Sequence, residues 1–445
     1  MLRTEAGKTL QLAFPIILGE LSQMALGIID TAMVGAVSYK QLAAAALVMS
    51  FINIPYVFGI GITISVSQMV SMAHGRNDRK HVSHYLYNGF WLCAGSAVLI
   101  ALFLEFSKGI LLHLDQDPEV ALLAVPYLQI MGWSVIPMLL FLALKQFSDG
   151  LELTKTAMIL SMAALPMNAF LNWLMIFGHW GFPRMELTGA GWATLITRIF
   201  IFLVLALIIL YHKTFRRYIA VRSIVWKINR RTQKELLAIG IPSSFQITME
   251  SAAFAVSGIL IGTIGAVEQA AHQIALSLAS LTFMVSMGLS QAGSIRTSNA
   301  FGRRDRKAIA FIGKSTIFMA LIYGTLCGIG FILFRKTLPT LFNENAAVIN
   351  MAAYLLIFAA FFQISDSTQS ISAGLLRGIK DVKVPTWFIF IAYWIIGIPI
   401  GYTLAFHYDM GAAGIWTGFI TGLTFSALFL SLRFKKMGVD KHREK

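Results

Sequence analysis

Long apolar segments recur from one end of the chain to the other, and they restrict its possible folds more than any other feature. Twelve such segments are separated by short polar loops. A helix needs about 20 residues to cross the hydrocarbon core of a bilayer, and every segment reaches that length. None shows the alternation of apolar and polar residues expected of membrane β-strands. The sequence therefore predicts an all-α integral membrane protein with twelve transmembrane helices. The predicted spans are residues 10–36, 42–73, 86–106, 121–148, 156–177, 188–211, 236–262, 268–298, 309–334, 346–376, 384–406 and 411–433.

The composition supports this assignment and argues against several classes of protein. Hydrophobic residues make up 57% of the chain and charged residues 13%, whereas soluble globular proteins carry about 25% charged residues. The two cysteines, Cys93 and Cys327, lie in different apolar segments without metal-ligand spacing, so we expect neither a disulfide nor a structural metal site. The sequence contains no phosphate-binding loop, HExxH or GxSxG motif. We therefore expect neither an ATP-driven pump nor an enzyme.

The positions of the positive residues predict the orientation in the membrane. The net charge of +15 would suit nucleic acid, but the Lys and Arg residues lie mainly in short loops between apolar segments. If the N-terminus is cytoplasmic, 27 of them fall on the cytoplasmic side and five on the other. The positive-inside rule then places both termini in the cytoplasm, and we expect no nucleic-acid partner. The remaining four lie near predicted helix ends, where snorkelling accommodates them. They are Lys145, Arg198, Arg296 and Lys314.

The chain repeats itself after 227 residues. That shift superposes Pro15 on Pro242 and Gly61 on Gly288, and the loops 75–80 and 302–307 match at five of six positions. Since six spans separate equivalent positions, both halves enter the membrane from the same side. This predicts two homologous six-helix lobes in a parallel repeat, related by a pseudo-twofold axis along the membrane normal. The expected domains are an N-terminal lobe (1–211), a basic cytoplasmic linker (212–235) and a C-terminal lobe with a cytoplasmic tail (236–445).

Several acidic residues fall inside the predicted spans, where an ionised side chain costs at least about 2.5 kcal/mol. Asp30, Glu250 and Asp366 have no cationic residue one helical turn away, so each needs a partner from elsewhere. That partner could be a proton, a metal cation, a cationic substrate or a distant side chain. Glu105 lies near an interface, and Glu20 could pair with a polar neighbour. The three unneutralised acids are therefore the leading candidates for a functional role.

Amide side chains add further candidates. Asn168 and Asn172 are four residues apart and share one helix face, which could line a water-filled cavity or contact another helix. The repeat places neutral Gln23 opposite Glu250, so only the second half carries an acid at that level.

Several segments together resemble the multidrug and toxic compound extrusion transporters, in particular the NorM type, along essentially the whole chain. These segments are 30–35, 147–150 with 153–155, 168–173, 240–250, 270–273, and 366–381. The resemblance implies an antiporter in which an inward sodium or proton gradient drives export of organic, mainly cationic, compounds through a cavity between the lobes.

The resemblance also implies roles for individual residues. Glu250 and Asp366 match the acids of the family's cation site in the C-terminal lobe. Asp30, Asn168 and Asn172 match a polar cluster tied to proton or drug handling. Gln23 and Gln273 are secondary candidates. Phe362 stands where some members carry Tyr, so a phenolic contact to the cation is lost although a ring face remains. The choice between sodium and proton therefore stays open.

The same superfamily offers one alternative, a flippase for lipids or lipid-linked oligosaccharides. Such a cavity should be conspicuously cationic to hold a pyrophosphate, whereas the clearest charges within the predicted spans are acidic. For the transporter we expect a monomer in a bacterial cytoplasmic membrane, with no cofactor, that contacts membrane lipid and small organic cations.

Overall fold

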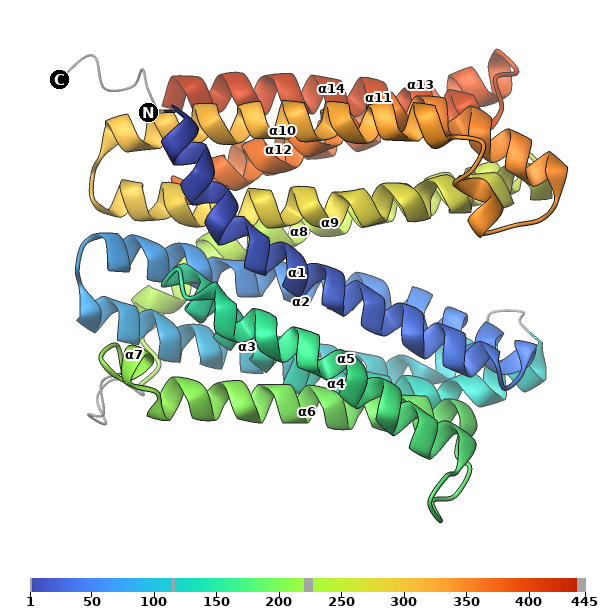
Figure 1. Ribbon diagram of the computed structural model, residues 1–445, viewed down its shortest axis with the longest axis horizontal. Coiled ribbons are helices and arrows are strands. Elements are labelled where there is room, and N and C mark those ends of the chain that lie inside the picture. Colours follow the sequence, from blue (N-terminus) through green and yellow to red (C-terminus); the bar gives the residue numbers. More distant parts are fainter. Residues whose placement is uncertain (1, 114–116, 220–226, 438–445) are drawn as a thin grey trace. The chain divides into compact units, whose positions relative to one another are not determined.

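The computed structural model describes residues 2–113, 117–219 and 227–437, and the regular structure in these ranges is helical (Figure 1). Twelve helical stretches are long and apolar enough to cross a membrane, which confirms the predicted fold class. They are α1 (Leu2–Gly35), α2 (Tyr39–Gly75), α3 (Arg79–Ser107) with the 3-10 turn Lys108–His113, α4 (Pro118–Gly150), α5 (Thr154–Phe177), α6 (Glu186–Tyr211), α8 (Arg230–Gly262), α9 (Ala266–Gly302), α10 (Arg306–Phe334), α11 (Ala346–Gly378), the broken span Lys383–His407 and α14 (Ala412–Lys435).

Most helices are longer than the apolar segments that predicted them. For example, α1 begins at Leu2 and α8 at Arg230, because the polar residues beyond the apolar segment continue the helix. Part of the predicted linker 212–235 is therefore helical, and it also contains the short helix α7 (Lys213–Arg216). The linker residues 220–226 and the tail residues 438–445 lie outside the described residues.

The eleventh span is not a single regular helix. It consists of α12 (Lys383–Phe390), a π-helical segment Ile391–Gly397, α13 (Ile398–Tyr402) and a second π-helical segment Thr403–His407. Pro399 lies in the short helix between the two wide segments. Because proline has no N–H, it interrupts the regular hydrogen-bond pattern of an α-helix.

The chain forms two compact units. The N-terminal unit is Leu18–Ser244, and the C-terminal unit combines Met1–Ile17 with Phe245–Lys445. These boundaries differ from the predicted lobes, since the beginning of α1 belongs to the C-terminal unit and the beginning of α8 to the N-terminal unit. The two points at which a helix changes unit are equivalent in the 227-residue repeat.

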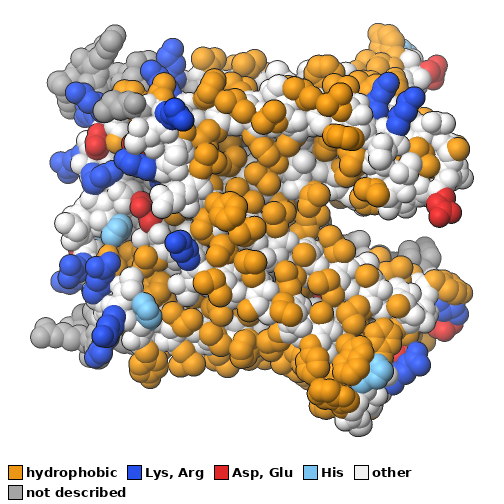
Figure 2. Space-filling view, viewed as in Figure 1, with side chains coloured by type: hydrophobic (Ala, Val, Ile, Leu, Met, Phe, Trp, Pro, Cys, Tyr) orange, Lys and Arg blue, Asp and Glu red, His pale blue; other side chains and the backbone are white. Residues whose placement is uncertain are grey.

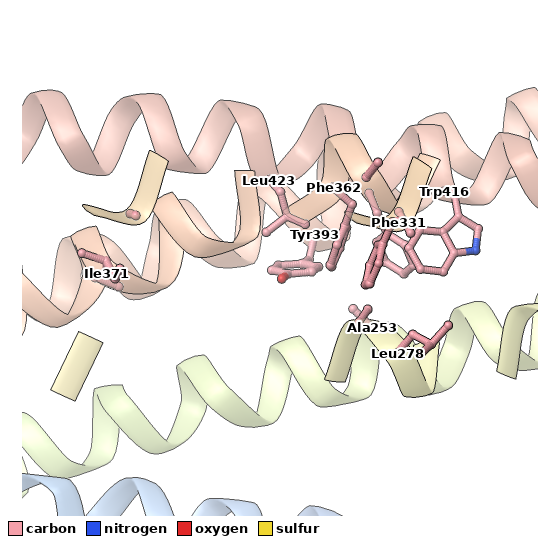
Figure 3. Packing of buried hydrophobic residues seen from close by; sticks show 14 of the residues in the cluster. Ala253, Leu278, Phe331, Phe362, Ile371, Tyr393, Trp416 and Leu423 are labelled. Atoms are coloured by element: carbon pink, nitrogen blue, oxygen red, sulfur yellow. The ribbon is translucent and has the colours of Figure 1, made fainter. Parts of the chain in front are cut away.

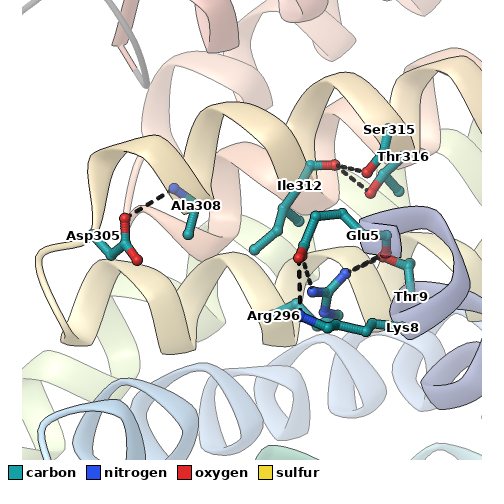
Figure 4. A network of polar contacts seen from close by, with 9 residues as sticks. All are labelled: Glu5, Lys8, Thr9, Arg296, Asp305, Ala308, Ile312, Ser315 and Thr316. Carbon is teal, nitrogen blue, oxygen red and sulfur yellow. Dashed lines mark hydrogen bonds and ion pairs between the residues drawn. The ribbon is translucent and has the colours of Figure 1, made fainter. Parts of the chain in front are cut away.

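Polar contacts near the helix starts explain this membership. In the C-terminal unit, Arg296 Nη1 on α9 donates to the Glu5 carbonyl oxygen at 2.7 Å and to Thr9 Oγ1 at 2.6 Å (Figure 4). The Arg296 guanidinium also forms an ion pair with the Glu5 carboxylate. In the N-terminal unit, the Tyr85 hydroxyl on α3 donates to Glu235 Oε2 on α8 at 2.7 Å.

The loops after α2 and α9 show the repeat at atomic detail. Asp78 caps α3 by accepting from the His81 backbone N–H at 3.1 Å, and the equivalent Asp305 caps α10 by accepting from Ala308 at 3.0 Å (Figure 4). The residue before each cap adopts the left-handed conformation, with φ of 60° at Asn77 and 59° at Arg304. Desolvation raises the pKa of Asp78, but hydrogen bonds from the His81 backbone and ring hold that pKa below its usual value.

A close helix crossing is also repeated. A Cβ atom added to Gly61 on α2 would lie 2.3 Å from the Cα of Ser244 on α8, within the N-terminal unit. At the equivalent Gly288 on α9, a Cβ atom would lie 2.4 Å from Ile17 Cγ1 on α1, within the C-terminal unit. The absence of a side chain at these glycines allows the close approach of the helices, as at small-residue interfaces in other membrane proteins.

Apolar side chains both fill the units and cover their helices. In the C-terminal unit a buried cluster contains Phe362, Tyr393 and Trp416, which Figure 3 shows close together. Hydrophobic side chains are also widespread on the outer surface, and Lys and Arg gather toward helix ends (Figure 2). Phe106 is 85% exposed and Leu333 71% exposed, a distribution suited to contact with lipid.

Candidate functional site

The N-terminal unit brings Asp30 of α1 together with two asparagines of α5. Asn172 Nδ2 donates to Asp30 Oδ1 at 2.6 Å and lies 3.1 Å from Asn168 Oδ1. Thr194 of α6 donates through its hydroxyl to Asp30 Oδ2 at 2.9 Å. All four side chains are buried. The carboxylate of Asp30 is therefore held by neutral amide and hydroxyl donors from two other helices.

One oxygen beside the Asp30 carboxylate can still accept a hydrogen bond. Asn172 Oδ1 is buried and has no hydrogen-bond partner among the described residues. An amide oxygen can accept a hydrogen bond or coordinate a hard cation, and the Asp30 carboxylate can do the same. The nearest charged groups include Arg198 on α6, which interacts electrostatically with Asp30 and donates to Ser134 Oγ at 2.6 Å.

The C-terminal unit contains a second acidic site, formed by α8 and α11. Gln369 Nε2 on α11 donates to Glu250 Oε1 on α8 at 2.8 Å. Asp366 lies one turn before Gln369 on the same helix, is buried, and interacts electrostatically with Glu250. Arg377, farther along α11, also interacts electrostatically with Glu250. Glu250 thus interacts with a second carboxylate, Asp366, and with one guanidinium, Arg377.

Aromatic rings form one wall near these acids. Phe362, one turn before Asp366, packs edge to face against Trp416 of α14, with 5.5 Å between ring centroids. It also packs edge to face against Phe254 of α8, with 6.0 Å between centroids. Since Phe362 is almost completely buried in this cluster, its side chain supports the packing beside Asp366 and presents no hydroxyl to it.

The secondary candidates lie in different surroundings. Gln23 on α1 is partly buried, and its amide nitrogen has no hydrogen-bond partner in the part of the chain that is described. Gln273 on α9 is exposed. The exposed Gln273 side chain therefore differs from that of Glu250, which is partly buried and bonded to Gln369.

Sequence reasoning missed several residues around these sites. Thr194 provides a hydroxyl from α6, and no local pattern marks it. Gln369 and Arg377 lie in the segment 366–381 that carried the family resemblance, but their contacts with Glu250 were not predicted. Lys145 lies near the end of α4 as expected, but the expectation that its side chain snorkels is wrong. Its side chain is 4% exposed, and its Nζ donates to Glu20 Oε1 at 2.9 Å. The i,i+4 spacing of Lys145 and Asp149 was the available signal.

Comparison with known proteins decides the family. The MatE family model matches residues 15–174 and 242–403, one stretch in each half of the chain. The chain belongs to the MatE family. This confirms the resemblance to the multidrug and toxic compound extrusion transporters that the sequence motifs indicated.

Relatives match nearly the whole chain. It is 33% identical to a probable multidrug resistance protein NorM from Brucella suis, over 96% of this chain and 92% of the relative. It is 34% identical to the multidrug resistance protein MdtK from Edwardsiella ictaluri, over 97% and 95% of the two chains. Among solved structures, the eukaryotic MATE transporter AtDTX14 superposes with a TM-score of 0.89 at 20% identity, covering 98% of each chain. The last likeness supports the same MatE fold.

Neither acidic site has the composition of a structural metal centre. Within the described ranges, no group of three or more His, Cys, Asp or Glu side chains is placed to hold a metal ion. The acidic sites instead combine carboxylates with amides, a hydroxyl and aromatic rings.

Proposed function

We propose that this MatE family member exports organic, mainly cationic, compounds in exchange for sodium ions or protons by alternating access. The observation that carries the proposal is the buried Asp30 carboxylate, whose hydrogen-bond donors are the neutral Asn172 and Thr194 side chains. A buried carboxylate without a bonded cation is costly, so binding a proton or cation there releases free energy. The names of the NorM and MdtK relatives support the choice of drugs as substrates.

The Glu250 site supports the same proposal. Glu250 interacts electrostatically with Asp366 and with Arg377, so two carboxylates and one guanidinium belong to the group and one further positive charge would balance it. Alternating access requires that the coupling cation and the exported compound weaken each other's binding, because they favour different arrangements of the protein. The flippase alternative has less support, since acids outnumber basic residues in both sites whereas a pyrophosphate requires cations.

Transport by purified protein in lipid vesicles tests the proposal. Efflux of a fluorescent organic cation is measured after a sodium gradient or a proton gradient is imposed separately, with protein-free vesicles as the control. We expect one of the two gradients to drive uphill movement of the dye. Dye movement that is unaffected by either gradient would contradict cation coupling.

We further propose that the chain lies in the cytoplasmic membrane of a bacterium with both termini in the cytoplasm, as its positive residues predict. Cysteine labelling tests this orientation in a variant in which Cys93 and Cys327 are replaced by Ala. Arg231 and Arg184 are both exposed, and each is changed to Cys in turn. An impermeant reagent added outside intact cells should modify Arg184→Cys and leave Arg231→Cys unmodified. The reverse pattern would contradict the orientation.

A further inference from the structure

The N-terminal unit contains a second group of ionisable side chains that the Asp30 site does not use, two of them buried and one, Glu20, 18% exposed. Lys145 Nζ on α4 donates to Glu20 Oε1 on α1 at 2.9 Å and lies 3.4 Å from Asp149 Oδ2. The Lys145 side chain is 4% exposed and that of Asp149 1% exposed. We call Glu20, Lys145 and Asp149 the ionic triad.

The triad has one more acidic group than basic groups. If all three side chains are ionised, two carboxylates face one ammonium and a single negative charge remains. Removing uncompensated charge from water costs several kcal/mol per ion even after relaxation. One bound proton would make the triad neutral. A metal ion would bind less favourably than a proton, because the Lys145 ammonium already lies beside both carboxylates and would repel a metal cation.

Other helices contribute polar groups around the triad. Tyr56 on α2 lies within electrostatic range of both Glu20 and Arg198, and Arg198 on α6 is itself bonded to Ser134. On α5, the Ser161 hydroxyl is buried and has no hydrogen-bond partner among the described residues.

The position of Ser161 connects it with the triad. A Cβ atom added to Gly19, the neighbour of Glu20, would lie 4.0 Å from Ser161 Oγ and 3.8 Å from Lys145 Cε. The Ser161 hydroxyl and the Lys145 side chain thus lie near the same point beside Gly19, which places the hydroxyl in the neighbourhood of the triad. A hydroxyl can donate to a carboxylate or accept from a carboxylic acid.

The second half of the chain contains a related arrangement. Glu250 on α8 interacts with Arg377 near the end of α11, as Glu20 on α1 pairs with Lys145 near the end of α4. The repeat places Glu20 one turn before the position equivalent to Glu250. In each unit, an acid on the first helix of the half thus interacts electrostatically with a base on the fourth helix, as an ion pair in the first half only, and the positions are not identical.

We propose that the ionic triad is a second proton-binding site, in which one proton from water is shared between Glu20 and Asp149 and the Lys145 ammonium stabilises the remaining carboxylate. Binding breaks one O–H bond of a hydronium ion in the solvent, forms one carboxyl O–H bond and requires no other reactant. The site deepens the proposed cation-coupled transport and rests on it for its biological role. Proton binding itself is measurable without transport.

Infrared difference spectroscopy on the purified full-length protein tests the site directly. Spectra recorded across an acid titration show the carbonyl stretch of each carboxylic acid that becomes protonated, and exchange into D2O shifts that band. We expect wild type to show a band that is lost or shifted in Glu20→Gln and in Asp149→Asn. The same band should persist in Asp30→Asn, which alters the proposed coupling site. It should also persist in the matched control Glu119→Gln, whose carboxylate pairs with Lys40 at the surface.

Ser161→Ala provides a milder variant that keeps all three charges. We expect it to shift the frequency or the titration midpoint of the triad band. If the two triad variants do not fold, a band unchanged in Ser161→Ala overturns the proposal. If Glu20→Gln and Asp149→Asn fold, a band that is unchanged in both variants overturns the proposal. A triad band in a protein that shows no ion-driven efflux would overturn the proposed transport function while supporting the proton site.

Discussion

Asn172 donates its side-chain amide to the carboxylate of Asp30 at 2.6 Å, across a sequence separation of 142 residues. The bond joins α5 to α1 at a buried position. Because the Asn172 amide is neutral, it orients the Asp30 carboxylate without neutralising its charge. Asp30 therefore keeps its capacity to bind a proton or a cation.

Asp30→Asn should impair efflux while the protein still inserts. The substitution keeps the size of the side chain but removes its charge. Hydrogen bonds to a charged group contribute about 1.5–3 kcal/mol, so we expect ion-driven transport to fall by roughly 10- to 100-fold. Dye efflux from vesicles that contain equal amounts of protein measures the loss. Full transport by a normally expressed variant would show that Asp30 has only a structural role or none.

Thr194→Val tests a ligand of Asp30 that the sequence did not reveal. Valine has a similar shape but cannot donate to Asp30, so we expect transport to fall by roughly 3- to 10-fold, as for the loss of one hydrogen bond of about 1 kcal/mol. Thr197→Val is the matched control, because Thr197 is also buried on α6 but donates only to the Ala193 carbonyl oxygen of its own helix. Equal losses in both variants would argue against a specific role for Thr194.

Glu250→Gln and Asp366→Asn should affect one shared step. If the two carboxylates hold the same cation, removing either one abolishes the site, and residues that act as a unit give strongly non-additive losses. We expect each single change to reduce ion-dependent drug release by at least about tenfold, and the double change to be little worse. The measurement compares wild type, both single variants and the double variant in vesicles. Two modest defects that multiply in the double variant would indicate independent roles.

Gly61→Ala should destabilise the N-terminal unit. A Cβ atom there would lie 2.3 Å from the Ser244 Cα, and backbone cannot move away as a flexible side chain can. Overpacking typically costs about 1–3 kcal/mol, which should lower the apparent melting temperature in detergent. Gly95→Ala on α3 is the control, since no atom lies within 4 Å of a Cβ there and alanine favours helix by about 1 kcal/mol. Unchanged stability of Gly61→Ala would contradict the close crossing.

Arg296→Gln should loosen the beginning of α1. It removes the ion pair with Glu5 and at least one of the bonds to the Glu5 carbonyl and Thr9 (Figure 4). We expect a loss of about 1.5–3 kcal/mol and faster proteolysis near the N-terminus. Lys8→Gln removes only an exposed pair with Glu5 and should cost under about 1 kcal/mol. Similar protease sensitivity in both variants would contradict this difference.

The sequence predicted the helices well and the contacts between them poorly. Apolar length is a local property, so all twelve spans were found, and the repeat predicted that Asp78 and Asp305 occupy equivalent loops. By contrast, Lys145 and Glu20 are 125 residues apart, and their pairing depends on how α4 packs on α1. Gln369 and Glu250 are likewise far apart in the sequence, and their hydrogen bond depends on how α11 packs on α8. A single sequence identifies an acid that needs a partner but does not reveal the helix that supplies it.

The membership of the beginning of α1 in the C-terminal unit has a consequence for biosynthesis. Thr9 leaves the ribosome 287 residues before its partner Arg296. At about 5–20 residues per second, translation of that interval takes about 15–60 s. During this time the start of the first helix is inserted without its native neighbours. Synthesis of the second half of the chain therefore sets the earliest moment at which the first helix reaches its final position.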